Sequence, residues 1–194
     1  MVSISACWRA RGRLWPLLSP SENAHLERFA RLARRKEWLA GRIAAKGAAS
    51  QFLGLRPDRV VIETGVRGQP LVHVDGAAVS GCHVSISHCD DLAVACCDRR
   101  RVGLDVQLSD DGVEPSDWLS PKERAAIEPL GPRARKRALL DAWCAREALA
   151  KWRGTGLSLP LTTFAIPNEA TLSTGSITFG GRAGRWARVG SAAA

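Results

Sequence analysis

The run Val102-Gly103-Leu104-Asp105-Val106-Gln107 alternates apolar and polar side chains, which predicts a β-strand with two unlike faces. Its aliphatic side chains point into a core. Asp105 and Gln107 are two residues apart, so they project together from the other face. Two oxygen donors side by side suit Mg²⁺, provided that a third oxygen donor comes from another segment.

The stretch Ala142–Lys151 predicts a helix that supplies this third donor. Glu147 and Lys151 are one turn apart on the face that also carries Trp143, so an acid and a base face the same place. Taken alone, such a pair is most often an ordinary surface ion pair. The oxygen donors of the predicted strand favour interpreting it as part of a site.

Signals for helices occur in the same order in each half of the chain. Ser19-Pro20-Ser21-Glu22 and Ser120-Pro121-Lys122-Glu123 have the spacing of a capping box with proline at the first helical position. The first helix is expected to run to the cluster Arg34–Lys36, and a second helix to cover Glu37–Phe52. A long helix is expected over Pro132–Gly154.

Short β-rich runs between turn residues follow the helices in each half. The expected strands are Arg59–Glu63, Pro70–Asp75, His83–His88, Leu92–Asp98, Arg101–Gln107, Thr163–Ile166, Ser176–Phe179 and Trp186–Val189. The spacing Trp38-x3-Arg42-x3-Lys46 has a counterpart in Trp143-x3-Glu147-x3-Lys151, which indicates an internal duplication. We therefore expect an α+β fold of two related lobes, residues 1–100 and 101–194, each with helices packed on a small antiparallel sheet.

The 194 residues carry a net charge of +9, with +7 in residues 1–50 and +5 in residues 131–153. Such a charge attracts nucleic acid, acidic membranes, phosphorylated small molecules or an acidic partner protein. The sequence contains neither an apolar run long enough to span a membrane nor a secretion signal. Its six cysteines form no C-x-x-C pair, which is typical of free thiols in a reducing compartment. We expect a soluble, cytoplasmic protein.

A third segment with polar side chains is Val84-Ser85-Ile86-Ser87-His88-Cys89-Asp90. Ser87 and His88 are adjacent on the expected strand, so they face opposite ways and cannot act together as a nucleophile and its base. At a strand end beside a hairpin, His88 is able to meet a phosphate.

Three of these segments together resemble the Sfp-type 4′-phosphopantetheinyl transferases. Ser87-His88, Gly103–Gln107 and Trp143–Lys151 stand close to the family patterns S-H, G-V/I-D-V/I-E and W-x-x-K-E-A/S-x-x-K, in the same order and at similar separations. Gly68-Gln69-Pro70 stands in the place of the family's G-K-P, and Gly154–Leu161 resembles the segment that follows the helix. The resemblance extends over most of the chain.

The resemblance implies two lobes related by a pseudo-twofold axis, with coenzyme A and Mg²⁺ held between them. It implies an enzyme that moves 4′-phosphopantetheine from coenzyme A to a serine of an acyl or peptidyl carrier protein and releases 3′,5′-ADP. By the family pattern, Asp105, Gln107 and Glu147 surround the metal. Lys151 meets the pyrophosphate, and Glu147 is the expected acceptor of the serine proton.

Further residues are implied to bind coenzyme A. Ser87 and His88 hold its phosphates, Arg35 and Lys36 help on its nucleotide side, and Gln69 takes the place of a lysine that touches phosphate. Carrier proteins are usually acidic, so the two basic segments are expected to speed docking. The internal duplication favours a monomer.

The sequence departs from the family pattern at three positions. Gln107 replaces a glutamate, which predicts weaker Mg²⁺ binding, and Gln69 and Arg146 replace lysines. Two other interpretations stay open: a catalytically silent protein of the same fold that binds coenzyme A or a carrier, and a basic nucleic-acid-binding domain. The last leaves the cluster of Asp105, Gln107 and Glu147 unexplained, and no helix-turn-helix, zinc-finger or RNP-type run is present. We expect no nucleic-acid or membrane partner.

Overall fold

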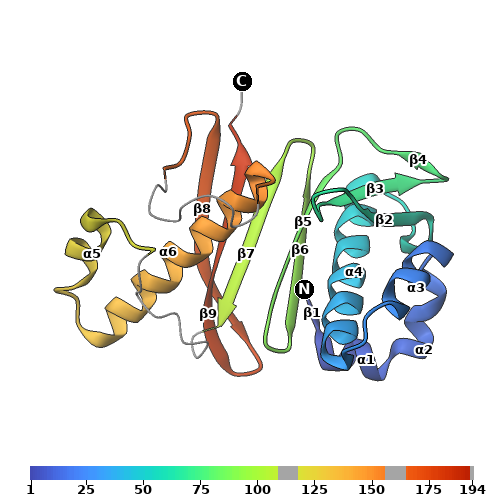
Figure 1. Ribbon diagram of the computed structural model, residues 1–194, viewed down its shortest axis with the longest axis horizontal. Helices are drawn as coiled ribbons and strands as arrows, with labels where there is room; N and C mark the ends of the chain where they lie inside the picture. Colours follow the sequence, from blue (N-terminus) through green and yellow to red (C-terminus); the bar gives the residue numbers. More distant parts are fainter. Residues whose placement is uncertain (109–117, 156–164, 193–194) are drawn as a thin grey trace. The chain divides into compact units, whose positions relative to one another are not determined.

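The computed structural model describes residues 1–108, 118–155 and 165–192. Contacts within the chain divide it into two compact units, Met1–Val102 and Gly103–Ala194. Each unit combines helices with small three-stranded sheets, which confirms the predicted α+β class (Figure 1). None of the helices in the described part of the chain has the length and apolar character that crossing a bilayer requires.

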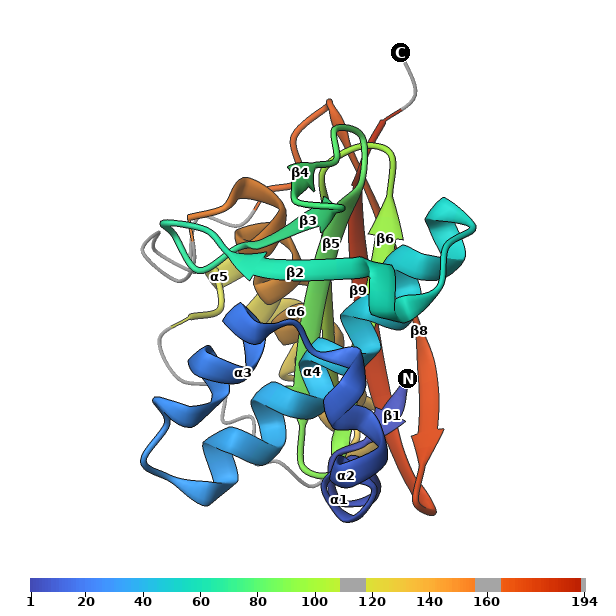
Figure 2. The ribbon, with the colours of Figure 1, turned by 90° about the vertical axis from the view of Figure 1, so that its right-hand side faces the viewer.

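The first unit places its helices before most of its strands. Its helices are α1 (Ile4–Arg9), α2 (Arg11–Leu14), α3 (Pro20–Glu27) and α4 (Leu32–Leu53), with 3-10 turns η1 (Trp15–Leu17) and η2 (Pro57–Arg59). Its strands are β1 (Val2–Ser3), β2 (Val60–Thr64), β3 (Pro70–Val74), β4 (Ala77–Ala78), β5 (His83–Cys89) and β6 (Leu92–Asp98). They form two antiparallel sheets, in the orders β1-β6-β5 and β2-β3-β4, and α4 packs against both (Figure 2).

Both expected helices of the first unit exist, but the boundary between them was predicted wrongly. The capping box of Ser19 and Glu22 begins α3 as expected, yet α3 ends at Glu27 rather than near Arg34–Lys36, and α4 begins at Leu32. The guanidinium of Arg35, from α4, lies at this end of α3. It donates hydrogen bonds to the carbonyl oxygens of Phe29 (2.7 Å) and Glu27 (3.1 Å), and so satisfies backbone groups that the helix leaves open.

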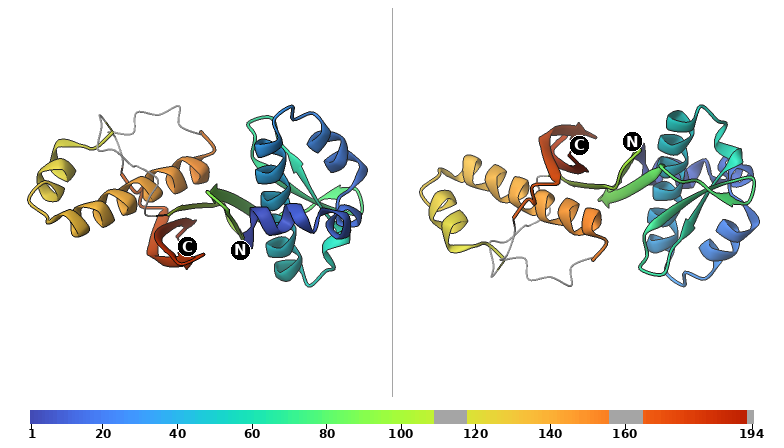
Figure 3. Two further views of the ribbon diagram at one scale, coloured as in Figure 1. Left: turned by 90° about the horizontal axis from the view of Figure 1, so that it is seen from below. Right: turned by 90° about the horizontal axis from the view of Figure 1, so that it is seen from above.

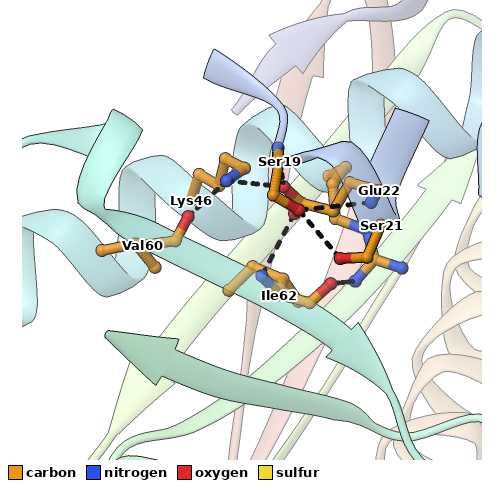
Figure 4. Close-up of polar contacts among 7 residues, drawn as sticks. Ser19, Ser21, Glu22, Lys46, Val60 and Ile62 are labelled. Atoms are coloured by element: carbon orange, nitrogen blue, oxygen red, sulfur yellow. Dashed lines mark hydrogen bonds and ion pairs between the residues drawn. The ribbon is translucent and has the colours of Figure 1, made fainter. Parts of the chain in front are cut away.

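A buried ion pair joins α3 to α4 in the first unit (Figure 4). The Lys46 ammonium lies 2.8 Å from the Glu22 carboxylate, with both side chains at most 2% exposed, and it also donates to the carbonyl oxygen of Val60 in β2. The other oxygen of Glu22 accepts the backbone N–H of Ile62 (3.1 Å). One turn earlier on α4, Arg42 donates to the carbonyl oxygen of Ile62 (2.7 Å). The charged side chains that the sequence places on one face of α4 are therefore internal links to α3 and β2.

Substituting Lys46 with methionine is expected to lower the free energy of unfolding by about 3 kcal/mol. The change leaves the Glu22 carboxylate buried without its cation and removes the donor to the carbonyl of Val60. Chemical denaturation measures the loss. Arg34→Met is the matched control, because the Arg34–Glu37 pair is exposed and is worth less than about 1 kcal/mol. Equal unfolding midpoints for the two variants would contradict a structural role for Lys46.

The second unit is built on one long helix and one sheet. Its elements are β7 (Val102–Leu108), α5 (Pro121–Ile127), α6 (Pro132–Arg153), β8 (Ala170–Phe179) and β9 (Arg182–Ser191), with the strand order β7-β9-β8. α6 packs along β9 on one face of this sheet (Figure 3). Their core consists of the side chains of Cys144, Ala145, Ala148, Leu149, Trp152, Ala170, Ala187 and Val189.

The last strands are longer than the sequence indicates. The runs Ser176–Phe179 and Trp186–Val189 lie inside β8 and β9, which pair antiparallel over their full length from Ala170 opposite Ser191. The strand expected at Thr163–Ile166 is wrong in its second half, because residues 165 and 166 belong to no strand, and its first half lies outside the described residues. Continuous hairpin pairing, rather than local composition, sets the lengths of β8 and β9.

The two long helices end in the same way. α4 and α6 both have 22 residues, and each is capped by a glycine in the left-handed region, Gly54 (φ 68°) and Gly154 (φ 70°). Lys46 and Arg146 stand at equal distances before that glycine, and each pairs with the glutamate of the capping box in its own unit. The internal correspondence therefore joins Lys46 to Arg146, and not to Lys151 as the tryptophan spacing suggested.

Candidate functional site

The aliphatic side chains of β7 are buried as its sequence predicts, and Asp105 on the opposite face is buried as well. A Cβ built on Gly103 would collide with the carbonyl oxygen of Ala148 and lie 2.6 Å from the amide nitrogen of Trp152, so α6 rests directly on the strand at Gly103. Because side chains alternate along a strand, α6 covers the face that carries Gly103, Asp105 and Gln107. The absence of a side chain at Gly103 thus allows the helix to approach the two oxygen donors.

Lys151 joins α6 to β7. Its ammonium donates to Oδ1 of Asp105 (2.7 Å) and to the carbonyl oxygen of Leu104 (3.0 Å). The Asp105 side chain is 7% exposed, whereas that of Lys151 is 30% exposed. A buried carboxylate is therefore neutralised by a cation that still reaches solvent and is able to contact an anion.

Glu147 lies one turn before Lys151 and is half-buried. Burial raises the pKa of its carboxyl group above the ordinary value, the negative charge of Asp105 raises it further, and the ammonium of Lys151 opposes the rise. Glu147 is thus within electrostatic reach of both Asp105 and Lys151. The strand and the helix bring together the acid, the base and the aspartate that the sequence predicts for one place.

Asp105, Gln107 and Glu147 have the chemistry of a magnesium site. Mg²⁺ is a hard cation that prefers oxygen ligands and usually takes one or two protein carboxylates, with waters and substrate phosphates in its other positions. Two carboxylates and one amide oxygen match that preference. Within residues 1–108, 118–155 and 165–192, no group of three His, Cys, Asp or Glu side chains is arranged to hold a metal.

Ser87 and His88 belong to the first unit and lie on opposite faces of β5, as predicted. Ser87 is 4% exposed and pairs across the sheet with Val94, whereas His88 is exposed and pairs with Ala93. The exposed imidazole is near the hairpin between β5 and β6. There, Asp90 adopts a positive φ of 48°.

The remaining residues expected to bind coenzyme A also lie in the first unit. Arg35 donates to backbone carbonyls at the end of α3, and Lys36 is half-buried beside it on α4. Gln69 is exposed in the hairpin between β2 and β3, where its Oε1 accepts the backbone N–H of Arg67 (2.9 Å). The guanidinium of Arg35 thus has a structural role that the sequence did not indicate.

Glu123 lies near the site, and the sequence predicted only its role in the capping box of a helix. The capping box is confirmed, because its carboxylate accepts hydrogen bonds from the backbone N–H (2.9 Å) and Oγ (2.6 Å) of Ser120. The same carboxylate also forms an ion pair with Arg146, the residue immediately before Glu147. No sequence pattern connects residues 123 and 146, so only the folded chain reveals this pair.

Comparison with known families identifies the class of protein that this fold and site define. The model of the 4′-phosphopantetheinyl transferase superfamily matches residues 101–190, and that of the 4′-phosphopantetheinyl transferase N-terminal domain matches residues 22–97. The first match contains β7, α6 and the candidate site, and the second contains Ser87 and His88. The chain belongs to the 4′-phosphopantetheinyl transferase superfamily.

Individual relatives agree with this assignment. The chain is 24% identical over 156 residues to a 4′-phosphopantetheinyl transferase of Bacillus subtilis, covering 79% of this chain and 68% of the relative. It is 27% identical over 146 residues to the 4′-phosphopantetheinyl transferase HetI of Nostoc sp., covering 73% and 61%. A holo-[acyl-carrier-protein] synthase of Staphylococcus saprophyticus is 34% identical over 85 residues, covering 41% and 71%. The chain thus spans about two thirds of the length of the two transferases.

Proposed function

We propose that this chain transfers 4′-phosphopantetheine from coenzyme A to a serine hydroxyl of an acyl or peptidyl carrier protein and releases 3′,5′-ADP. The observation that carries the proposal is the contact of Lys151 with Asp105, with Glu147 in electrostatic reach of both. These residues lie in the segment that matches the superfamily. The names of the relatives support the same reaction.

The serine oxygen attacks the phosphorus that carries the pantetheine, and the bond from that phosphorus to the bridging oxygen of the diphosphate breaks. The leaving 3′,5′-ADP keeps the bridging oxygen and its electron pair. Glu147, half-buried one turn before Lys151, accepts the serine proton. Lys151, with its partly exposed ammonium, neutralises negative charge on the diphosphate oxygens.

Asp105, Gln107 and Glu147 would hold Mg²⁺ in the C-terminal lobe, residues 101–194. When bound, the ion supplies positive charge that offsets the charge of the diphosphate. The phosphates and the nucleotide end of coenzyme A would be bound by Ser87, His88, Arg35, Lys36 and Gln69. Of the two residues of β5, His88 is exposed and Ser87 is buried.

An acidic carrier protein is the partner that the charge of the chain favours. The segments 1–50 and 131–153 carry net charges of +7 and +5, and opposite charges accelerate encounter between proteins. We place the reaction in a reducing cytoplasm. No disulfide joins the six cysteines, all of which lie in the described residues, and the thiols of Cys82 and Cys97 share a hydrogen bond with their sulfur atoms 3.2 Å apart.

Mass spectrometry of the carrier tests the proposal. The protein is incubated with coenzyme A, Mg²⁺ and an apo carrier protein, and the expected result is a carrier heavier by one phosphopantetheine. The Asp105→Ala variant of the protein is expected to produce no such increase in the mass of the carrier. If the wild-type protein modifies none of several fatty acid, polyketide and peptide carriers, the catalytically silent interpretation is favoured. Salt-dependent binding to DNA without affinity for coenzyme A would favour a nucleic-acid-binding domain.

Replacing Gln107 with glutamate is expected to lower the Mg²⁺ concentration for half-maximal transfer by about tenfold, because the site gains a charged ligand. The measurement is a Mg²⁺ titration of carrier modification at saturating coenzyme A. Gln51→Glu is the matched control, since Gln51 is exposed on α4 in the first unit. An unchanged Mg²⁺ requirement in Gln107→Glu would remove Gln107 from the metal site.

A further inference from the structure

Arg146 is a charged side chain of α6 that lies inside the second unit. Its side chain is 1% exposed. One guanidinium nitrogen donates to the carbonyl oxygen of Ala142 (3.1 Å), and the other pairs with Oε2 of Glu123 from α5. A guanidinium that is buried and engaged at both terminal nitrogens is poorly placed to bind an anion from solvent.

Aromatic contacts complete the attachment of Arg146 to the segment before α5. The guanidinium carbon lies 5.1 Å from the ring centroid of Trp118, a cation–π distance. The Trp118 ring in turn meets Trp143 of α6 edge to face, with centroids 5.5 Å apart. We call Trp118, Glu123 and Arg146 the α5–α6 clamp.

The clamp also holds the first turn of α5. The Glu123 oxygen that pairs with Arg146 accepts two hydrogen bonds from Ser120. Burial would raise the pKa of Glu123, but the hydrogen bonds from Arg146 and Ser120 outweigh it and lower the pKa below the ordinary value. The carboxylate therefore remains charged at neutral pH, and the ion pair persists.

The first unit contains the same device with a lysine. Lys46 occupies the position of Arg146 relative to the capping glycine and pairs with Glu22, the capping-box glutamate of that unit. The positions equivalent to Glu147 and Lys151 are Gly47 and Gln51. The first unit therefore has the buried pair of a cation and a capping-box glutamate, but no acid and base beside it. A cation at this position thus has a structural use that is independent of the site.

We propose that Arg146 is a positioning residue: it holds the turn of α6 that carries Glu147 against α5 and does not contact coenzyme A. The proposal rests on the proposed transferase function for its effect on rate. Arg146 directly precedes Glu147, so releasing its side chain allows that turn to shift. A displacement of a catalytic carboxylate by a fraction of an ångström lowers the rate without weakening substrate binding.

The test compares Arg146→Met, Arg146→Lys, Glu123→Gln and the double variant Glu123→Gln/Arg146→Met. We expect Arg146→Met to lower kcat by about tenfold and to leave the KM for coenzyme A within about twofold. Arg146→Lys restores most of kcat, because a lysine serves as the clamp in the first unit. Arg124→Met is the control, since it removes an exposed arginine of α5 by the same substitution and should keep wild-type kinetics.

The outcomes distinguish a failure of the positioning role of Arg146 from a failure of the proposed transferase function. A tenfold rise in the KM for coenzyme A with unchanged kcat would make Arg146 a ligand and overturn the positioning role. If the wild-type protein modifies no carrier, the proposed function fails, and the clamp is judged by urea unfolding. A double variant no less stable than Arg146→Met supports the clamp, because the two residues then act as one unit, whereas additive losses contradict it.

Discussion

Replacing Glu147 with glutamine is expected to lower the kcat of carrier modification by about a thousandfold. The amide keeps the shape of the side chain but cannot accept the serine proton, and it removes one negative charge from the expected Mg²⁺ ligands. Glu147 is half-buried, and its pKa responds to the charges of Asp105 and Lys151. The measurement is single-turnover transfer to an apo carrier at saturating coenzyme A.

Glu128→Gln is the matched control for this prediction, because Glu128 is an exposed carboxylate at the end of α5. It should retain wild-type kcat. Calorimetric binding of coenzyme A to Glu147→Gln separates a chemical defect from a folding defect, since the variant should still bind the coenzyme. If Glu147→Gln keeps more than about a tenth of the wild-type kcat, Glu147 is not the general base.

Replacing Gly103 with alanine is expected to prevent the second unit from folding, with a loss of about 5 kcal/mol or more in the free energy of unfolding. The new Cβ would overlap the carbonyl oxygen of Ala148 and crowd the amide nitrogen of Trp152. Both are backbone atoms of α6, so no side chain can turn aside to make room. Soluble yield and urea unfolding of the full chain report the effect.

Gly47→Ala provides the comparison, because nothing lies within 4 Å of a Cβ at that position inside α4. Alanine favours helix over glycine, so this variant should be more stable than the wild type by about 1 kcal/mol. A Gly103→Ala protein that unfolds at the wild-type urea concentration would show that α6 does not rest on β7 at this point.

Local signals placed the helix ends that carry a capping box or a capping glycine, but they missed the boundary between α3 and α4. The capping boxes of Ser19 and Ser120 place α3 and α5 correctly, because each is complete within four consecutive residues. The end of α3 carries no such pattern, and the predicted helix was too long. Arg35 of α4 reaches back to the carbonyl groups of Glu27 and Phe29 at this point, a contact that the sequence did not indicate.

The internal duplication likewise shows a difference between what local spacing suggests and what the folded chain contains. Spacing within the helices suggested that Lys46 corresponds to Lys151, because both follow a tryptophan at the same interval. In the folded protein Lys46 pairs with Glu22 and corresponds to Arg146, which pairs with Glu123. The partner of a charged side chain identifies its role more reliably than its distance along the chain from an aromatic residue.

By itself, the sequence determined which side chains share a face: Asp105 with Gln107 on a strand, and Glu147 with Lys151 on a helix. Backbone periodicity dictates those relations before any packing occurs. Only the tertiary structure decided that Lys151 meets Asp105 and that Gly103 must lie under α6. These contacts join segments more than forty residues apart, and they depend on how closely the helix and the strand pack.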